Sequence, residues 1–283
     1  MAIKYGELNV DEKYSKILEP NLYVDSVFAD GITFTSKYEE KGGAIYVHKL
    51  GTSACEVGTP GRDFTDEASS DNLIQIVMNN NYQKSKKIYG VQANAVEFAL
   101  GEEQLSTATK EVAQGWTIGG LGCLLNEGTA SQNQATALTK TNLKAQVLAD
   151  RKAIRDAHGK ADVILMGTEA YALLLELSGS EFTPIANDNV NASGQMGKWL
   201  GFTVIECNGL GEASFDYYDY AGTKQTVTPT AKNYIMYNHE ALSIVNNFEV
   251  ARIIDSELFS GSKAQVELNA GFRVTNADMV VIH

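Results

Sequence analysis

The longest regular pattern of apolar positions runs from Ala93 to Leu125, where apolar residues recur every three to five positions. This spacing is typical of one face of an α-helix, so we predict a long helix here. Its far end, Ile118 to Leu125, is apolar nearly all round and should be buried. Because glycine weakens a helix interior, we expect bends at Gly101, Gly115, Gly119, Gly120 and Gly122.

Strand patterns lie on both sides of this helix. Before it, residues 32–38 and 44–48 alternate partially around the turn signal Glu39 to Gly43, which predicts an exposed hairpin. Residues 51–71 hold many small and acidic residues, as is typical of a loop, and a short buried strand follows over residues 73–78.

Two long alternating strands are predicted near the end of the chain, over Phe248–Leu258 and Ala264–Val274. Residues Phe259 to Lys263 connect them, so we expect a second, longer hairpin with a loop at its tip. A final short buried strand is predicted over Met279–Ile282.

Short helices and buried strands alternate in the middle of the chain. Thr141 caps a predicted helix that Gly159 ends, and Thr168 begins another that reaches Leu177. The predicted buried strands are Ala161–Met166, Phe202–Glu206 and Tyr234–Tyr237. Residues 178–198 and 209–231 are polar enough to be loops.

Two parts of the chain hold apolar or aromatic side chains that need a partner surface. Residues 1–31 contain short apolar clusters separated by charges, and residues 209–231 contain a run of tyrosines. Tyrosine-rich loops suit protein contact surfaces because tyrosine supplies amphipathic area at a low entropy cost. The contact candidates in these parts are Leu22, Tyr23, Phe28, Tyr217 and Tyr218.

Composition narrows the class of protein. The chain has 283 residues, 44% of them hydrophobic, which is enough for one large domain or two moderate ones. Its formal net charge of -12 disfavours nucleic-acid binding as the main activity. The best local basic strip is Lys84, Lys86 and Lys87. The three cysteines, Cys55, Cys123 and Cys207, are widely spaced and should be reduced thiols.

No catalytic constellation emerges from the sequence. The histidines His48, His158, His239 and His283 are not at metal-ligand spacing, and no phosphate-binding or nucleophile-elbow motif occurs. No apolar run approaches the length of a membrane span, and the N-terminus has no secretory signal. We therefore expect no enzyme activity, cofactor, metal site or membrane partner, with an unrecognised α+β enzyme as the remote alternative.

The order of these segments and three short stretches of sequence are similar to those of a known protein family. The stretches are Ala161–Gly167 followed by a helix, Gly201–Ile205, and the ending Gly271–Val274 with Met279–Ile282. Over nearly its whole length the chain resembles the major capsid proteins of tailed phages with the Hong Kong 97-type fold. The resemblance implies an α+β fold with these parts: N-terminal arm 1–31, extended hairpin (E-loop) 32–70, peripheral domain with a spine helix 71–140, α/β axial domain 141–239, peripheral return strands 240–275 and final axial strand 276–283.

The function implied by this resemblance is a shell subunit that forms hexamers and pentamers around a phage genome, in a virion assembled in the bacterial host cytoplasm. It adds Lys41, Gly42, Gly43, Phe259, Gly261 and Lys263 to the intersubunit contact candidates. The short N-terminal arm implies a separate scaffolding protein, or none, and the resemblance adds a portal and, at most, non-specific contact with packaged DNA. An encapsulin-like shell of a bacterial nanocompartment is the nearest alternative.

Overall fold

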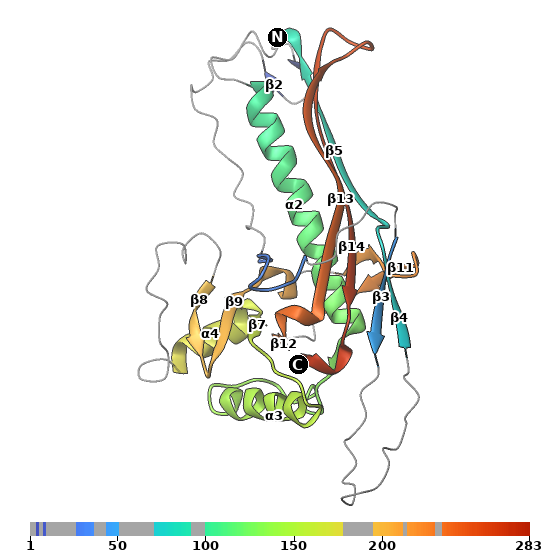
Figure 1. Cartoon of the computed structure of the whole chain (residues 1–283). Helices are drawn as coiled ribbons and strands as arrows, with labels where there is room; N and C mark the ends of the chain where they lie inside the picture. Colours follow the sequence, from blue (N-terminus) through green and yellow to red (C-terminus); the bar gives the residue numbers. More distant parts are fainter. Residues whose placement is uncertain are drawn as a thin grey trace, which may run out of the picture.

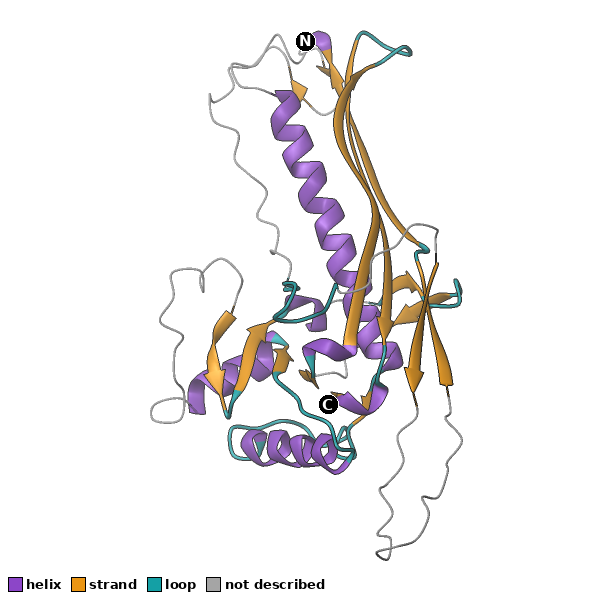
Figure 2. Ribbon diagram, viewed as in Figure 1, coloured by secondary structure: helices purple, strands orange, loops and turns teal. Residues whose placement is uncertain are grey.

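The computed structural model describes residues 4–5, 8–9, 27–36, 44–50, 71–91, 100–177, 195–211, 214–229 and 234–283. A long helix and three long strands form an elongated body, and a more rounded unit of strands and short helices lies at one end of it (Figures 1 and 2). This α+β architecture agrees with the fold class expected from the sequence.

The helix of the elongated body is α2, which spans Leu100–Glu127 and is about 42 Å long at roughly 1.5 Å per residue. Strands β5 (Asn80–Tyr89), β13 (Leu242–Asp255) and β14 (Gly261–Val274) form an antiparallel sheet in the order β13-β14-β5, here called the long sheet. Helix α2 covers one face of the long sheet, with Ala108 and Val112 packed against Val266.

The glycines of α2 serve close packing, and the helix is continuous through them. A Cβ atom on Gly120 would lie 2.7 Å from the Phe28 ring, and one on Gly122 would lie 2.7 Å from the Tyr217 ring. Both contacts are shorter than carbon atoms tolerate, so only glycine lets these rings approach the helix backbone. The predicted helix began at Ala93, but residues 92–99 lie outside the described part of the chain.

The rounded unit is built on a six-stranded sheet with parallel and antiparallel neighbours, here called the mixed sheet. Its order is β6 (Thr129–Ala130), β15 (Val280–Ile282), β12 (Tyr234–Tyr237), β7 (Val163–Met166), β9 (Phe202–Glu206) and β8 (Gln195–Trp199). Its alternate residues enter two cores, one shared with the end of α2 and the other with α3 (Leu143–Asp156) and α4 (Thr168–Leu177).

The hairpin predicted across Glu39 to Gly43 is wrong in its pairing. Strand β3 (Ala44–Leu50) pairs with β4 (Asp71–Val77), across residues 51–70. Thr35 bridges Ser243 of β13 instead. The apolar faces of β3 and β4 explain why these two strands pair, because Ile45, Val47 and the fully buried Ile76 pack beside Val245.

Three smaller expectations also change. Residues 195–199 form strand β8 rather than a loop, because Leu200 and Gly201, both with positive φ, turn the chain into a tight hairpin with β9. The supposed loop 209–231 contains a hairpin of β10 (Phe215–Tyr218) and β11 (Lys224–Val227). Asn142, not Thr141, occupies the N-cap of α3.

The remaining described elements are short. Strands β1 (Lys4–Tyr5) and β2 (Leu8–Asn9) pair with each other. Three 3₁₀ turns lie at Asn208–Gly211, His239–Ala241 and Ala277–Met279. The last two are the connections by which the chain passes between the mixed sheet and the long sheet.

Candidate functional site

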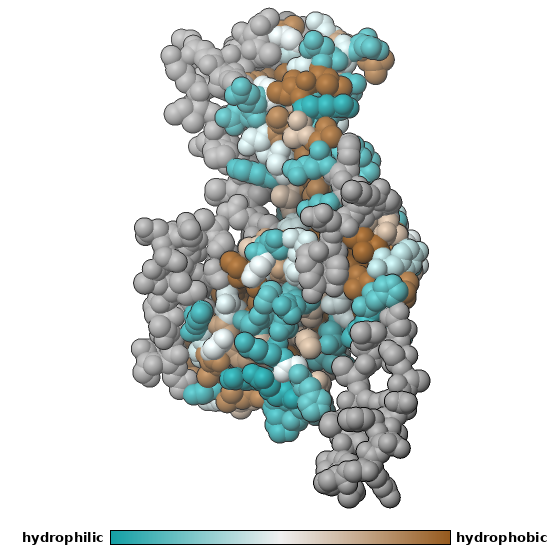
Figure 3. Space-filling view, viewed as in Figure 1, coloured by the Kyte–Doolittle hydropathy of each residue, from teal (hydrophilic) through white to brown (hydrophobic). Residues whose placement is uncertain are grey.

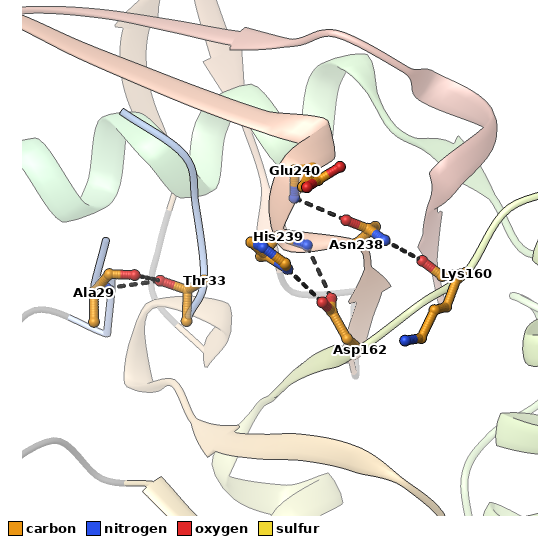
Figure 4. Close-up of polar contacts among 7 residues, drawn as sticks. All are labelled: Ala29, Thr33, Lys160, Asp162, Asn238, His239 and Glu240. Carbon is orange, nitrogen blue, oxygen red and sulfur yellow. Dashed lines mark hydrogen bonds and ion pairs between the residues drawn. The ribbon is translucent and has the colours of Figure 1, made fainter. Parts of the chain in front are cut away.

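Histidine and carboxylate side chains meet at the connection between β12 and β13 (Figure 4). The Asp162 carboxylate accepts a hydrogen bond from the backbone N–H of His239 at 2.9 Å and contacts the His239 ring through Nδ1. Asn238 donates from Nδ2 to the carbonyl oxygen of Lys160 at 2.6 Å. These contacts fasten the connection to the start of β7, which is a structural role.

A second polar cluster is buried beneath α3. Asp150 accepts hydrogen bonds from Ser131 Oγ at 2.6 Å and Tyr234 Oη at 2.5 Å. His283 stacks on the Tyr234 ring at 4.8 Å, and its Nδ1 lies 3.7 Å from Asp150 Oδ2. Burial, with the Asp150 charge beside it, raises the pKa of Tyr234 far above its usual range. This cluster ties α3 to the mixed sheet and has no opening to solvent, because both Asp150 and His283 are buried.

A third polar cluster joins the end of α2 to β14. Glu127 lies 3.2 Å from the Arg273 guanidinium and accepts a hydrogen bond from the backbone N–H of Val274. Arg273 also stacks on the Tyr220 ring at 3.5 Å, which holds the β10–β11 hairpin against the body. Burial raises the pKa of the Glu127 carboxyl more than Arg273 lowers it.

The two described cysteines are packing residues. Cys123 and Cys207 are buried, and burial raises the pKa of both thiols, to about 11 for Cys207. A thiol that stays protonated is a poor nucleophile and a poor metal ligand. Across the described ranges, no group of three or more His, Cys, Asp or Glu side chains is placed to hold a metal ion. No helix in the same ranges is long and apolar enough to cross a membrane.

The contact candidates fall into three groups. Leu22, Tyr23, Lys41, Gly42 and Gly43 lie outside the described residues. Phe28 and Tyr217 lie in the core, against the α2 glycines, so their role is packing within the subunit. Their contact with a neighbour stays a prediction. Tyr218, next to Tyr217 on the opposite side of β10, is 44% exposed.

The remaining candidates gather at the tip of the β13–β14 hairpin. Lys87 Nζ lies 5.9 Å and Lys263 Nζ lies 5.8 Å from the centroid of the Phe259 ring. Leu258 beside it is 86% exposed. Gly261 has a φ of 149°, and a Cβ there would lie 2.1 Å from the carbonyl oxygen of Ile88, so this turn requires glycine. The tip therefore presents an apolar side chain beside two cations.

The basic strip predicted on β5 is divided between the two faces of the long sheet. Lys84 and Lys86 point toward α2 and form ion pairs with Glu111 at 2.9 Å and 2.7 Å. Lys87 alternates to the outer face, the face away from α2. It is opposite Lys263 in the register, and Arg252 lies two rows further along on the same face.

A shallow hollow of about 330 Å³ on the long sheet is lined by Gln83, Ser85, Arg252, Gln265 and Glu267, among others. It is wide and polar, which suits contact with another chain better than enclosure of a small molecule. The sequence pattern did not single out Arg252 as a cation on the same face as Lys87. Strand alternation places both on one face once the register of the strands is known.

Comparisons with known proteins find no matching family model and no matching curated sequence. Solved structures do match. A structure of Mycobacterium phage Che8 has a TM-score of 0.71 at 17% identity, covering 96% of this chain and 95% of that one. The capsid structure of cyanophage P-SCSP1u has a TM-score of 0.72 at 12% identity, covering 96% and 91%.

The chain has the fold of phage capsid subunits. This confirms the resemblance inferred from the order of segments. A virus-like particle from Pyrococcus furiosus shares the fold more distantly, with a TM-score of 0.54 at 10% identity over 89% of each chain.

Proposed function

We propose that this chain is a major capsid protein, which self-assembles into pentamers and hexamers that close an icosahedral phage head around the genome. The observation that carries the proposal is the structural likeness to capsid subunits over nearly the full length of both chains. The polar clusters of the described residues support a non-catalytic role, because each one fastens elements of the fold together. The protein would then belong to the virion, after assembly in the host cytoplasm.

The parts of the subunit would share this work as follows. The long sheet and α2 form the peripheral domain of residues 71–140 and 240–275, and the mixed sheet with α3 and α4 forms the axial domain of residues 141–239 and 276–283. Residues 1–31 act as the arm and residues 32–70 as the E-loop. Strand β6 at Thr129–Ala130 pairs with β15 in the mixed sheet, which favours a boundary nearer the end of α2 than residue 140.

We further infer that the outer face of the long sheet binds residues 51–70 of a neighbouring copy. That segment holds four acidic residues, Glu56, Asp63, Asp66 and Glu67, against one arginine. The outer face and tip offer Lys87, Lys263 and Arg252. Charge complementarity of this kind steers association and sets the register of an interface.

Chain length favours a neighbour over the same subunit as the source of this segment. Figure 1 shows β4 leading into β5, so the tip is about 50 Å of extended chain away from Asp71 at roughly 3.3 Å per residue. Residues 51–70 must return to their start, because Leu50 pairs with Asp71. Half of the segment reaches about 33 Å at most, too short for the tip of its own subunit.

Reversing two charges at the tip should block assembly. In the Lys87→Glu/Lys263→Glu variant the tip repels an acidic segment, and we expect the yield of sedimenting shells to fall at least tenfold, since like charges in contact cost on the order of 1 kcal/mol or more at each copy. Lys110→Glu/Lys198→Glu, which reverses two exposed lysines elsewhere, should assemble normally. Adding Asp66→Lys/Glu67→Lys to the tip variant should restore shells. Normal assembly of the tip variant would contradict the proposed contact.

Electron microscopy of the expressed full-length chain tests the proposed function itself. Closed shells, or rings of five and six subunits, are the expected result. A chain that stays monomeric at high concentration, alone and with the products of neighbouring genes, would overturn it. Supplying those products matters because a separate scaffolding protein and a portal are part of the proposal.

The second candidate function is an encapsulin-like shell, favoured by the likeness to the virus-like particle from Pyrococcus furiosus. Particle contents decide between the two functions. Nuclease-protected DNA in particles from the native source supports the phage head, whereas an enclosed enzyme without DNA supports the nanocompartment.

A further inference from the structure

Positive charge is concentrated around helix α3, in a chain that is acidic as a whole. Residues 140–160 hold six of the 23 Lys and Arg residues against two acidic ones. The basic residues are Lys140, Lys144, Arg151, Lys152, Arg155 and Lys160. The net charge of +4 over this stretch contrasts with -12 for the whole chain, so it is a local reversal of sign.

Folding exposes more of this positive charge than the sequence suggests. Asp150 is buried, where its carboxylate is held by Ser131 and Tyr234. The other acidic residue, Asp156, forms an i,i+4 ion pair with Lys152 at 2.6 Å. Neither carboxylate is left to offset Arg155 and Lys160, which are exposed.

Three of the six cations lie along one flank of α3. The buried side of the helix is formed by Leu143, Val147 and Ile154. At about 100° per residue, Lys144 and Arg155 fall on nearly the same line, a quarter turn from that buried side, and about 16 Å apart. Arg151 lies on this line as well, partly buried over the Phe202 ring and hydrogen-bonded to the Leu200 carbonyl.

Helix α3 also lies at the outside of the molecule. Figure 1 draws it at the end of the rounded unit farthest from the hairpin tip, and Figure 3 shows hydrophilic side chains gathered over that end. Its cations are therefore placed to meet a partner larger than a small molecule.

We propose that the exposed flank of α3 binds the phosphate backbone of nucleic acid without sequence preference. The inference rests on the proposed function, in which the shell encloses a genome. A row of cations with its acidic residues buried or paired matches a polyanion, whose charges repeat at short and regular intervals. Protein interfaces instead favour aromatic residues and are poor in lysine, and residues 140–160 contain no Phe, Trp or Tyr.

The proposed nucleic-acid contact lies on α3 and not on the basic strip that the sequence predicted on β5. Lys84 and Lys86 of the predicted strip both pair with Glu111, which offsets part of their positive charge within the subunit. Arg155 and Lys160 are exposed, and the acidic residues between 140 and 160 are buried, as Asp150 is, or paired with Lys152, as Asp156 is. Because the chain as a whole is acidic, we expect contact with DNA to be limited to this flank. Such limited contact suits a shell that encloses DNA without binding it tightly.

Binding of a labelled 30-base-pair duplex tests the proposal, using the full-length chain below its assembly concentration. Arg155→Gln/Lys160→Gln should weaken binding between about fivefold and thirtyfold at 0.15 M salt, and flatten the slope of log affinity against log salt by about two. Lys110→Gln/Lys198→Gln removes the same charge elsewhere and should leave affinity within about twofold. The charge-preserving variant Arg155→Lys/Lys160→Arg should bind as the unmodified chain does.

Three results would overturn the proposal: no duplex binding by the unmodified chain at 0.05 M salt, equal losses in the α3 and control variants, or an α3 variant that binds DNA normally but fails to assemble. The last result would make α3 a contact between subunits. Circular dichroism of each variant checks that the fold is kept. Shell formation by the unmodified chain is scored separately by microscopy, so failure of this inference is distinct from failure of the proposed function.

Discussion

Replacing Asp150 with alanine should destabilise the subunit by about 3–5 kcal/mol, because the change leaves buried partners without their acceptor. Ser131 Oγ and Tyr234 Oη both donate to this carboxylate. The His283 ring, 3.7 Å away, loses the nearby charge as well. Denaturant unfolding of the full-length chain measures the effect, below its assembly concentration, because assembly adds stability by mass action.

Asp156 provides the control on the same helix. Its side chain is 63% exposed and its partner Lys152 is 76% exposed, so Asp156→Ala should change stability by about 0.5 kcal/mol or less. Asp150→Asn should fall between the two, since the amide oxygen still accepts one hydrogen bond. If Asp150→Ala and Asp156→Ala lower the free energy of unfolding equally, the buried cluster does not stabilise the mixed sheet.

Local periodicity predicted the elements whose signals lie within a single window of sequence. The helix pattern identified α2, and Thr168 with Leu177 marked the bounds of α4 as the structure has them. Short apolar runs identified the inner strands of the mixed sheet. These strands are buried on both faces, so their sequences are continuous apolar runs that need no knowledge of a partner.

Pairing and burial depend on distant residues and were not predictable in the same way. The turn signal at Gly42 and Gly43 suggested a local hairpin, yet β3 pairs with β4 across residues 51–70 because both strands have an apolar face that covers Val245. Tyr217 was expected at the surface, but Gly122 of α2 leaves room for its ring. The local sequence does not identify Val245 or Gly122 as the packing partner.

The same limit applies to charge, and therefore to the candidate site. Lys84, Lys86 and Lys87 look equivalent in the sequence, but Glu111 of α2 forms ion pairs with two of them and the strand alternation turns the third outward. Around α3 the reverse holds, since the fold buries Asp150 and leaves Arg155 and Lys160 exposed. Composition supplies the total charge of a segment, whereas the fold decides which charges a partner meets.

Gly119→Ala should destabilise the subunit by about 2 kcal/mol or more, although alanine is the better helix former. The new Cβ would lie 2.0 Å from Tyr82 Oη and 2.8 Å from the Phe272 ring. Both rings sit between α2 and the long sheet, where overpacking typically costs about 1–3 kcal/mol and sometimes more. The gain in helix propensity is about 1 kcal/mol, which offsets only part of that cost. Thermal or denaturant unfolding of the unassembled chain measures the difference.

Gly101→Ala, in the first turn of the same helix, separates packing from helix propensity. A Cβ there would lie 3.3 Å from Ile253 Cδ1 and 4.0 Å from Ile88 Cδ1; the second distance is ordinary contact, and Ile253 is 42% exposed and free to give way. We expect Gly101→Ala to be neutral or to stabilise by up to about 1 kcal/mol. Opposite effects at Gly119 and Gly101 would show that α2 keeps glycine at its buried end so that aromatic rings can reach its backbone. If Gly119→Ala stabilises the chain as Gly101→Ala does, the close approach of Tyr82 and Phe272 does not constrain the helix, and the α2 glycines need another explanation.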